Sequence, residues 1–125
     1  MRVLVIQNFD GTGLGQLRTA LDEAGAQIDL RALHQGDALP ETIDDHDALI
    51  VLGGGQSALA DDDYPYLPHL VGFMRAFADS GRATLGVCLG AQLLARAFDA
   101  QVLVNSAYEF GWQTVALTPE GRDDP

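Results

Sequence analysis

Continuous apolar runs rich in β-branched residues recur along the chain. A run uninterrupted by polar residues is typical of a parallel strand that is covered on both faces. Such runs lie at residues 3–6, 48–52, 83–87 and 101–104. Residues 26–33, with Ile28 and Leu30 two positions apart, predict a further strand, and the alternation at residues 112–118 predicts a late strand that could run antiparallel.

Between these runs, apolar residues recur at spacings of three and four, which predicts helices at residues 14–24, 70–78 and 89–98. Gly25 and Gly81 follow the first two patterns as C-terminal caps. Strands and helices alternate, so the sequence predicts an α/β fold with a flavodoxin-like, doubly wound, mostly parallel sheet and helices on both faces. The chemistry of such folds lies at the carboxyl ends of the strands, here in loops 8–15, 53–65 and 86–90.

Composition narrows the class of protein. The length of 125 residues suits one domain, and 7 Lys and Arg against 18 Asp and Glu give a net charge of −11. This charge argues against binding to a nucleic-acid backbone or to an anionic membrane surface. One cysteine forms no internal disulfide, the first apolar run is too short for a signal peptide, and no run reaches the length of a membrane span. We therefore expect a cytoplasmic protein.

The single cysteine, Cys88, lies in the sequence GVCLG between a predicted strand and a predicted helix. A lone cysteine is most often a small buried hydrophobic residue. Here Gly86 and Gly90 allow a tight turn that lifts Cys88 to the edge of the sheet, and the N-terminus of the following helix favours the reactive thiolate. The pattern therefore favours a nucleophile elbow over simple packing.

Three segments together carry a resemblance to a known family. The pattern G-x-C-x-G-x-Q is matched by Gly86, Cys88, Gly90 and Gln92. In LGGGQSALADDDYPYL, Gly53 and Gly54 fit a G-G-P segment, with Gly55 where proline is usual. The stretch YEFGWQTVALTPEG at residues 108–121 resembles an E-x-G-W strand. On these residues the whole chain resembles the triad-type, class I glutamine amidotransferases, in particular the amidotransferase part of guanylate synthase.

The resemblance implies that the Cys88 thiolate attacks the side-chain amide of glutamine, forming a thioester and releasing ammonia. It implies an oxyanion hole made by the backbone N–H of Leu89 and of a glycine in the Gly53–Gly54 pair, most simply Gly54. Gln92, one helical turn after Cys88, would help to hold the substrate. We expect no metal and no cofactor, and an ammonia-receiving synthase or synthetase as partner.

The family's catalytic histidine is expected downstream of the nucleophile, in a His-x-Glu pair. In this chain His34, His46 and His69 all precede Cys88 and none follows it. Each is more typical of a surface residue, with His69 the nearest substitute. We therefore expect residues 1–125 to be a partial amidotransferase domain, with an apolar edge that favours homodimers and with little or no turnover by itself.

Two other functions stay open at this point. The related protease- and chaperone-like branch commonly carries a histidine directly after the cysteine, where this chain has Leu89. A non-enzymatic, glutamine-binding or regulatory module would fit the missing histidine. The glycine-rich GTGLG at residues 11–15 is interpreted as a loop bordering the site, and the acidic run 61–63 as a solvated loop rather than a metal site.

Overall fold

The computed structural model describes residues 1–104 and 111–122, in which strands and helices alternate. Apolar runs bounded by glycine or polar residues form the strands, and segments with three- and four-residue apolar spacing form the helices. The fold is therefore α/β, as predicted. The elements are β1 (Arg2–Gln7), α1 (Gln16–Glu23), β2 (Gln27–Ala32), the short 3₁₀-helix η1 (Leu33–Gln35), β3 (Ala48–Val51), α2 (Tyr66–Asp79), β4 (Ala83–Gly86), α3 (Leu89–Ala97) and α4 (Pro119–Arg122).

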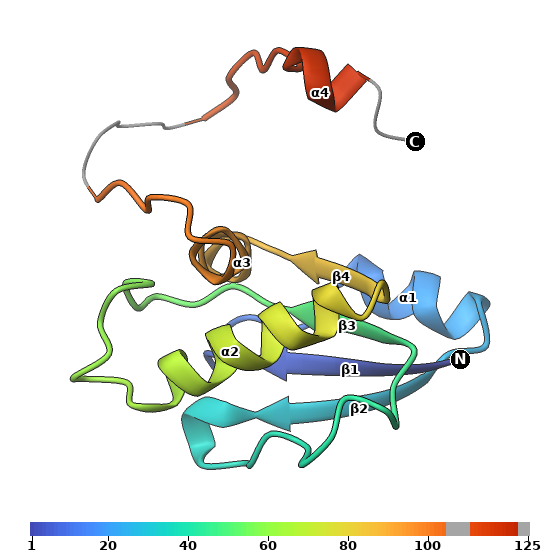
Figure 1. The fold of residues 1–125 in the computed structure, drawn as a ribbon. Coiled ribbons are helices and arrows are strands. Elements are labelled where there is room, and N and C mark those ends of the chain that lie inside the picture. Colours follow the sequence, from blue (N-terminus) through green and yellow to red (C-terminus); the bar gives the residue numbers. More distant parts are fainter. Residues whose placement is uncertain (105–110, 123–125) are drawn as a thin grey trace.

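The strands form one parallel sheet in the order β2-β1-β3-β4 (Figure 1). A flavodoxin-like sheet begins in this order, and the winding of the chain reverses between β1 and β3. Because the strands are parallel, the loops that follow β1, β3 and β4 meet at one edge of the sheet. The three loops that the sequence marks for chemistry therefore lie at the same edge.

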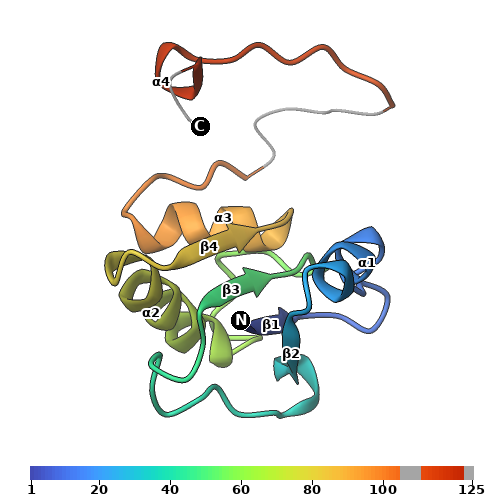
Figure 2. The same cartoon turned by 90° about the vertical axis from the view of Figure 1, so that its right-hand side faces the viewer.

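Different helices cover the two faces of the sheet, α2 and α3 on one and α1 on the other (Figure 2). Residues 3–6 of β1 are all buried, because alternate side chains enter two separate cores. Leu4 and Ile6 pack in the core formed with α2 and α3, whereas Val3 and Val5 pack on the side of α1. Because both faces of the strand are buried, its sequence is a continuous apolar run.

Two predicted strands are wrong within the described residues. Residues 101–104 form no strand, and Leu103 is 62% exposed there. Residues 112–118 also form no strand, and Trp112 is fully exposed. An apolar run becomes a strand only beside a strand edge that bonds its backbone, and these segments pair with none of the four strands. The start of the E-x-G-W segment lies outside the described residues.

Strand β4 forms one edge of the sheet and pairs with β3 alone in the part of the chain that the structure describes. Leu85 on this edge strand is 43% exposed, and Val87 just after it is 38% exposed. An unpaired strand with exposed apolar side chains favours association. This exposed edge gives a physical reason for the predicted homodimer, which stays a prediction. Over residues 1–104 and 111–122, no helix combines the length and the apolar composition that crossing a membrane requires.

Candidate active site

Cys88 lies at a sharp turn between β4 and α3. Strand β4 ends at Gly86 and helix α3 begins at Leu89, so only Val87 and Cys88 connect them. Cys88 has a φ of 55° and a ψ of −112°, and such a backbone costs a residue with a side chain about 1–3 kcal/mol. Its side chain is exposed. The chain therefore forms the predicted elbow, with a strained, accessible thiol at the N-terminus of a helix.

Two glycines of the elbow are required by close backbone crossings. A Cβ on Gly86 would lie 2.5 Å from the carbonyl carbon of Gly90, where contacts below 3.0 Å are essentially never seen. A Cβ on Gly90 would lie 2.8 Å from the carbonyl carbon of Val51 and closer still to its oxygen. That oxygen also accepts a hydrogen bond from the N–H of Val87 at 2.9 Å. The start of α3 is therefore packed directly on the end of β3.

The loop after β3 brings a second pair of glycines against the elbow. A Cβ on Gly53 would lie 3.3 Å from the Cβ of Cys88, and a Cβ on Gly54 would lie 2.8 Å from the Cδ2 of Leu89. Glycine permits this approach because it has no side chain. The structure therefore brings together four of the predicted site residues, two from the loop after β3 and two from the elbow.

Two backbone N–H groups beside the thiol are free to bind an anion. Within residues 1–104 and 111–122, neither the N–H of Leu89 nor that of Gly54 has a protein acceptor. The following N–H groups in the first turn of α3 are occupied, because they donate to the carbonyls of Val87 and Cys88. Unpaired N–H groups near a helix N-terminus attract negatively charged oxygen. The two groups can therefore form an oxyanion hole.

A hollow of about 330 Å³ opens at Cys88. It is lined by Leu17 and by residues 11–14, 52–54, 87 and 88. The glycine-rich loop after β1 therefore borders the site, as the sequence analysis expected. The volume lies at the lower end of the range for small-molecule sites, about 300–1,000 Å³. A substrate of the size of an amino acid would be consistent with it.

Gln92 lies one turn after Cys88 on α3, and its side chain is exposed. It borders a different hollow, which it shares with Gln101 and residues 102–103. Of the five predicted site residues, Gly53, Gly54 and Cys88 line the Cys88 hollow, and the buried Leu89 directly follows Cys88. Gln92 is the one that borders the other hollow. Its role in holding the substrate stays a prediction.

None of the three histidines of the chain lines the hollow at the elbow. His69 borders a separate hollow of about 500 Å³ between α2 and residues 33–40, which contains no thiol. His46, expected at the surface, is only 3% exposed. The reason is Asp29, whose carboxylate lies 3.0 Å from the Nε2 of His46. The guanidinium of Arg31 beside Asp29 lowers the pKa of that carboxyl to about 2, so the histidine is the donor.

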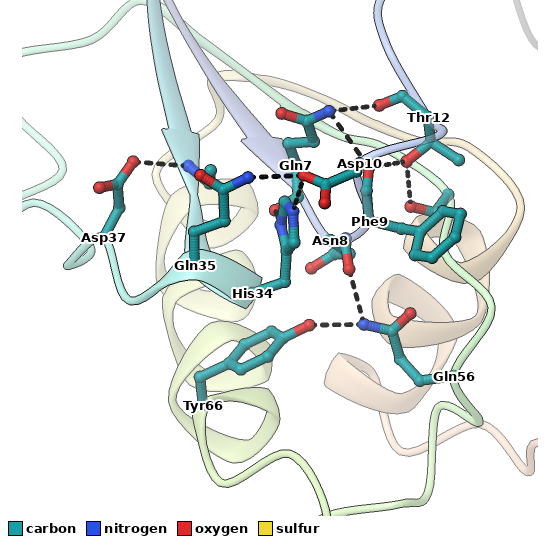
Figure 3. A network of polar contacts seen from close by, with 12 residues as sticks. Gln7, Asn8, Phe9, Asp10, Thr12, His34, Gln35, Asp37, Gln56 and Tyr66 are labelled. Carbon is teal, nitrogen blue, oxygen red and sulfur yellow. Dashed lines mark hydrogen bonds and ion pairs between the residues drawn. The ribbon is translucent and has the colours of Figure 1, made fainter.

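A polar network holds the loop after β1, and the sequence analysis did not identify it (Figure 3). The Nε2 of Gln7 donates to two carbonyls of the loop, at 3.1 Å each. The hydroxyl of Thr12 lies 3.0 Å from the carbonyl oxygen of Gly53, and the Nε2 of His34 lies 2.8 Å from the carboxylate of Asp10. The available signal was the polar sequence QNFDGT directly after the apolar run 3–6, where side chains gather at the carboxyl edge of the sheet.

His34 links the end of β1 to this loop. Its Nδ1 lies 3.1 Å from the carbonyl oxygen of Gln7 and its Nε2 lies 2.8 Å from Asp10, so both ring nitrogens face acceptors. The hydrogen bond with Asp10 raises the pKa of His34. A histidine whose pKa is higher in the folded than in the unfolded protein stabilises the fold fully at pH values below the unfolded pKa, about 6.5. This stabilisation is lost as the pH rises through the folded pKa.

We therefore expect Asp10→Asn to destabilise the fold at pH about 6 and to do so progressively less toward pH about 8.5. Urea denaturation of the wild type and of Asp10→Asn across this pH range measures the difference between their free energies of unfolding. Asp22→Asn is the matched control, because Asp22 pairs with Arg18, which stays charged throughout. The free energy of unfolding of this control should differ from that of the wild type by an amount that does not change with pH. A constant difference for Asp10→Asn would contradict the proposed charge state of His34.

The acidic run 61–63 is not fully solvated. Asp62 and Asp63 are exposed, but the carboxylate of Asp61 accepts hydrogen bonds from both terminal nitrogens of Arg96, at 2.7 and 2.5 Å. These bonds lower the pKa of Asp61 and tie the loop after β3 to α3. No group of three or more His, Cys, Asp or Glu side chains that could hold a metal ion occurs among the described residues.

Comparison with known proteins agrees with this geometry. A sequence model of the class-I glutamine amidotransferase family matches residues 5–122. Over 133 aligned residues the chain is 32% identical to the glutamine amidotransferase-like protein YfeJ of Salmonella typhimurium, covering 100% of this chain and 54% of YfeJ. Over 71 residues it is 34% identical to the glutamine-hydrolyzing GMP synthase of Vibrio vulnificus, covering 57% of this chain and 13% of the synthase.

A solved glutamine amidotransferase from Thermotoga maritima has the same fold. It superposes with a TM-score of 0.72 at 26% identity, covering 78% of this chain and 42% of that one. This chain therefore spans about half the length of these proteins, 54% of YfeJ and 42% of the solved chain. Because the family model covers nearly all of the sequence and the flavodoxin-like fold agrees, the chain belongs to the class-I glutamine amidotransferase family.

Proposed function

We propose that this chain carries the glutamine-hydrolysing site of an amidotransferase, with Cys88 as the nucleophile. The sulfur attacks the side-chain amide carbon of glutamine, a C–S bond forms, and the amide nitrogen takes up a proton and leaves as ammonia. Water then attacks the thioester carbonyl and releases glutamate and the thiol. The observation that carries the proposal is an exposed thiol at a strained elbow with two unoccupied backbone N–H groups beside it in the described residues.

In this mechanism the amide oxygen becomes negatively charged when sulfur adds to the carbon. The N–H groups of Leu89 and Gly54 would stabilise that charge, and loss of one such donor typically costs about 10²–10³ in rate. Gly53 leaves the thiol accessible, because a Cβ there would lie 3.8 Å from the Sγ of Cys88. Gln92 is proposed to contact the substrate from the first turns of α3.

The proton transfers need a base, and the described residues that line the hollow include no histidine, aspartate or glutamate. No histidine follows Cys88 in the sequence, and none lines the described hollow. We propose that residues 1–125 form the nucleophile and oxyanion half of an amidotransferase domain. The acid–base half, the downstream His-x-Glu segment of the family, would come from outside these residues.

The 125-residue chain is therefore expected to hydrolyse glutamine at least about a thousand times more slowly than a complete triad, because nucleophile and base act as a unit. Release of glutamate from glutamine measures the rate, and the same chain unfolded in urea gives the background. Normal turnover that Cys88→Ser abolishes would contradict the proposed division of the domain and would show that a base is present.

A second candidate function is a non-catalytic module that binds glutamine. The observation that favours it is the same lack of a histidine at the described hollow. Titration calorimetry with glutamine, combined with a test of Cys88 acylation, separates the two functions. A module would bind glutamine without acylation of Cys88 by an activated glutamyl ester, whereas the enzyme half would be acylated.

The proposed partner is a synthase or synthetase that accepts ammonia, since the chain resembles part of a glutamine-hydrolyzing GMP synthase. A nucleophilic thiol must stay reduced, so we propose a cytoplasmic location. The unpaired edge of β4, with Leu85 exposed, is the proposed surface for a homodimer.

A further inference from the structure

The hydroxyl of Thr12 lies between two carbonyl oxygens, 3.0 Å from that of Phe9 and 3.0 Å from that of Gly53. The Phe9 carbonyl already accepts hydrogen bonds from the N–H of Thr12 and from the Nε2 of Gln7, each at 3.1 Å. The carbonyl of Gly53, a buried residue, has no other donor within residues 1–104 and 111–122. A hydroxyl has one hydrogen, so donation to Gly53 satisfies an acceptor that would otherwise be unpaired.

The carbonyl of Gly53 belongs to the same peptide group as the N–H of Gly54. The described residues contain no cis peptide bond, so the C=O and the N–H of this group point in opposite directions. A hydrogen bond that fixes the carbonyl therefore also fixes the direction of the N–H. Two consecutive glycines place few steric limits on rotation of the peptide between them, so its orientation depends on such a bond.

We propose that Thr12 is a positioning residue that aims the Gly54 N–H at the carbonyl oxygen under attack by Cys88. The inference rests on the proposed function. It gives a specific role to Thr12 in the loop after β1, which borders the Cys88 hollow, whereas the family motifs lie in the loops after β3 and β4. Thr12 acts through the Gly53–Gly54 peptide, because its hydroxyl is engaged by the Gly53 carbonyl and is not free to bind the reacting oxygen.

The loop that carries Thr12 is held firmly enough for this role (Figure 3). The Nε2 of Gln7 donates to the carbonyl of Thr12 at 3.1 Å. The Nδ2 of Asn8 donates to the carbonyl of Leu52 at 2.9 Å, and the Nε2 of Gln56 donates to the carbonyl of Asn8 at 2.9 Å. These bonds tie the loop to the chain on both sides of the two glycines, so the position of the hydroxyl is fixed relative to them.

The test compares Thr12→Val, which keeps the shape and loses the hydroxyl, with Thr12→Ser, which keeps the hydroxyl. The first probe is the γ-p-nitrophenyl ester of L-glutamate. The Cys88 sulfur attacks the ester carbonyl, the C–S bond forms, the C–O bond breaks, and p-nitrophenolate leaves with its electron pair while the thiol proton goes to buffer. The carbonyl oxygen becomes an oxyanion on the way, and the leaving group needs no acid.

The second probe is iodoacetamide, from which the same sulfur displaces iodide without forming an oxyanion. Cys88 is the only cysteine of the chain, so both probes report on one site. Thr12→Val should lower the acylation rate by about tenfold and leave alkylation within about twofold, and Thr12→Ser should recover most of the acylation. Equal acylation of all three proteins, or an equal fall with both probes, would overturn the proposal.

Failure of the proposed function would look different. In that case the wild-type chain would react with iodoacetamide and would not take up the γ-glutamyl group. Backbone ¹⁵N relaxation then still tests the positioning itself, because it needs no reaction. Thr12→Val should increase the fast motion of the Gly54 N–H relative to the wild type and to Thr12→Ser. Unchanged motion in Thr12→Val would overturn the positioning role.

Discussion

Replacing Cys88 with serine is expected to slow acylation by the γ-p-nitrophenyl ester of L-glutamate on the order of a thousand-fold. A serine hydroxyl attacks only when a neighbouring base removes its proton, and no histidine lines the described hollow. A thiol needs this help less, because part of it is thiolate near neutral pH and sulfur is intrinsically more nucleophilic. The release of p-nitrophenolate by both proteins measures the ratio of rates.

Two controls separate loss of the nucleophile from loss of the fold. Cys88→Ser should keep its thermal midpoint within about 2 °C, because the two side chains are nearly isosteric and the position is exposed. The wild-type chain in urea keeps its thiol and loses the elbow, so its acylation should fall to that of a free cysteine peptide. A Cys88→Ser rate within about tenfold of the wild type would show that another group accepts the acyl chain.

Gly90→Ala is expected to lower the free energy of unfolding by about 3 kcal/mol or more, which is a fall of about 10 °C in the thermal midpoint. The new Cβ would lie 2.8 Å from the carbonyl carbon of Val51 and closer to its oxygen, and neither atom belongs to a side chain that could move aside. Helix α3 would have to shift away from β3 and carry the elbow with it. Circular dichroism during heating measures the change.

Gly72→Ala is the matched control for this substitution. Gly72 is an exposed residue inside α2, and a Cβ there would meet nothing within 4 Å. Alanine should therefore stabilise the helix by about 0.5–1 kcal/mol, the opposite sign. A Gly90→Ala protein as stable as the wild type would contradict the close crossing of α3 over β3.

The elements around the elbow could be predicted because their signals are local. Residues 3–6 form a continuous apolar run and are buried on both faces. Gly25 and Gly81, predicted to follow the first two helices, have positive φ angles of 65° and 77°. The sequence GVCLG likewise contains, in five neighbouring positions, the small residues that a tight strand–turn–helix crossing requires around Cys88.

The features that could not be predicted depend on segments far apart in the chain. Residues 101–104 resemble residues 3–6 in composition and still form no strand, because they pair with none of the four described strands. His46 is buried because Asp29, 17 positions away, accepts its hydrogen bond. Thr12 meets Gly53 across 41 positions, and no local pattern encodes that contact.

Alkylation of Cys88 by a chloromethyl ketone analogue of L-glutamine tests most directly whether the thiol lies in a glutamine site. The sulfur displaces chloride and forms a C–S bond, and mass spectrometry of the intact chain and its peptides locates and counts the adduct. A glutamine site predicts one adduct at Cys88, at least about tenfold faster labelling by the L than by the D enantiomer, and protection by L-glutamine. Equal labelling by both enantiomers, with no protection by L-glutamine, would contradict it.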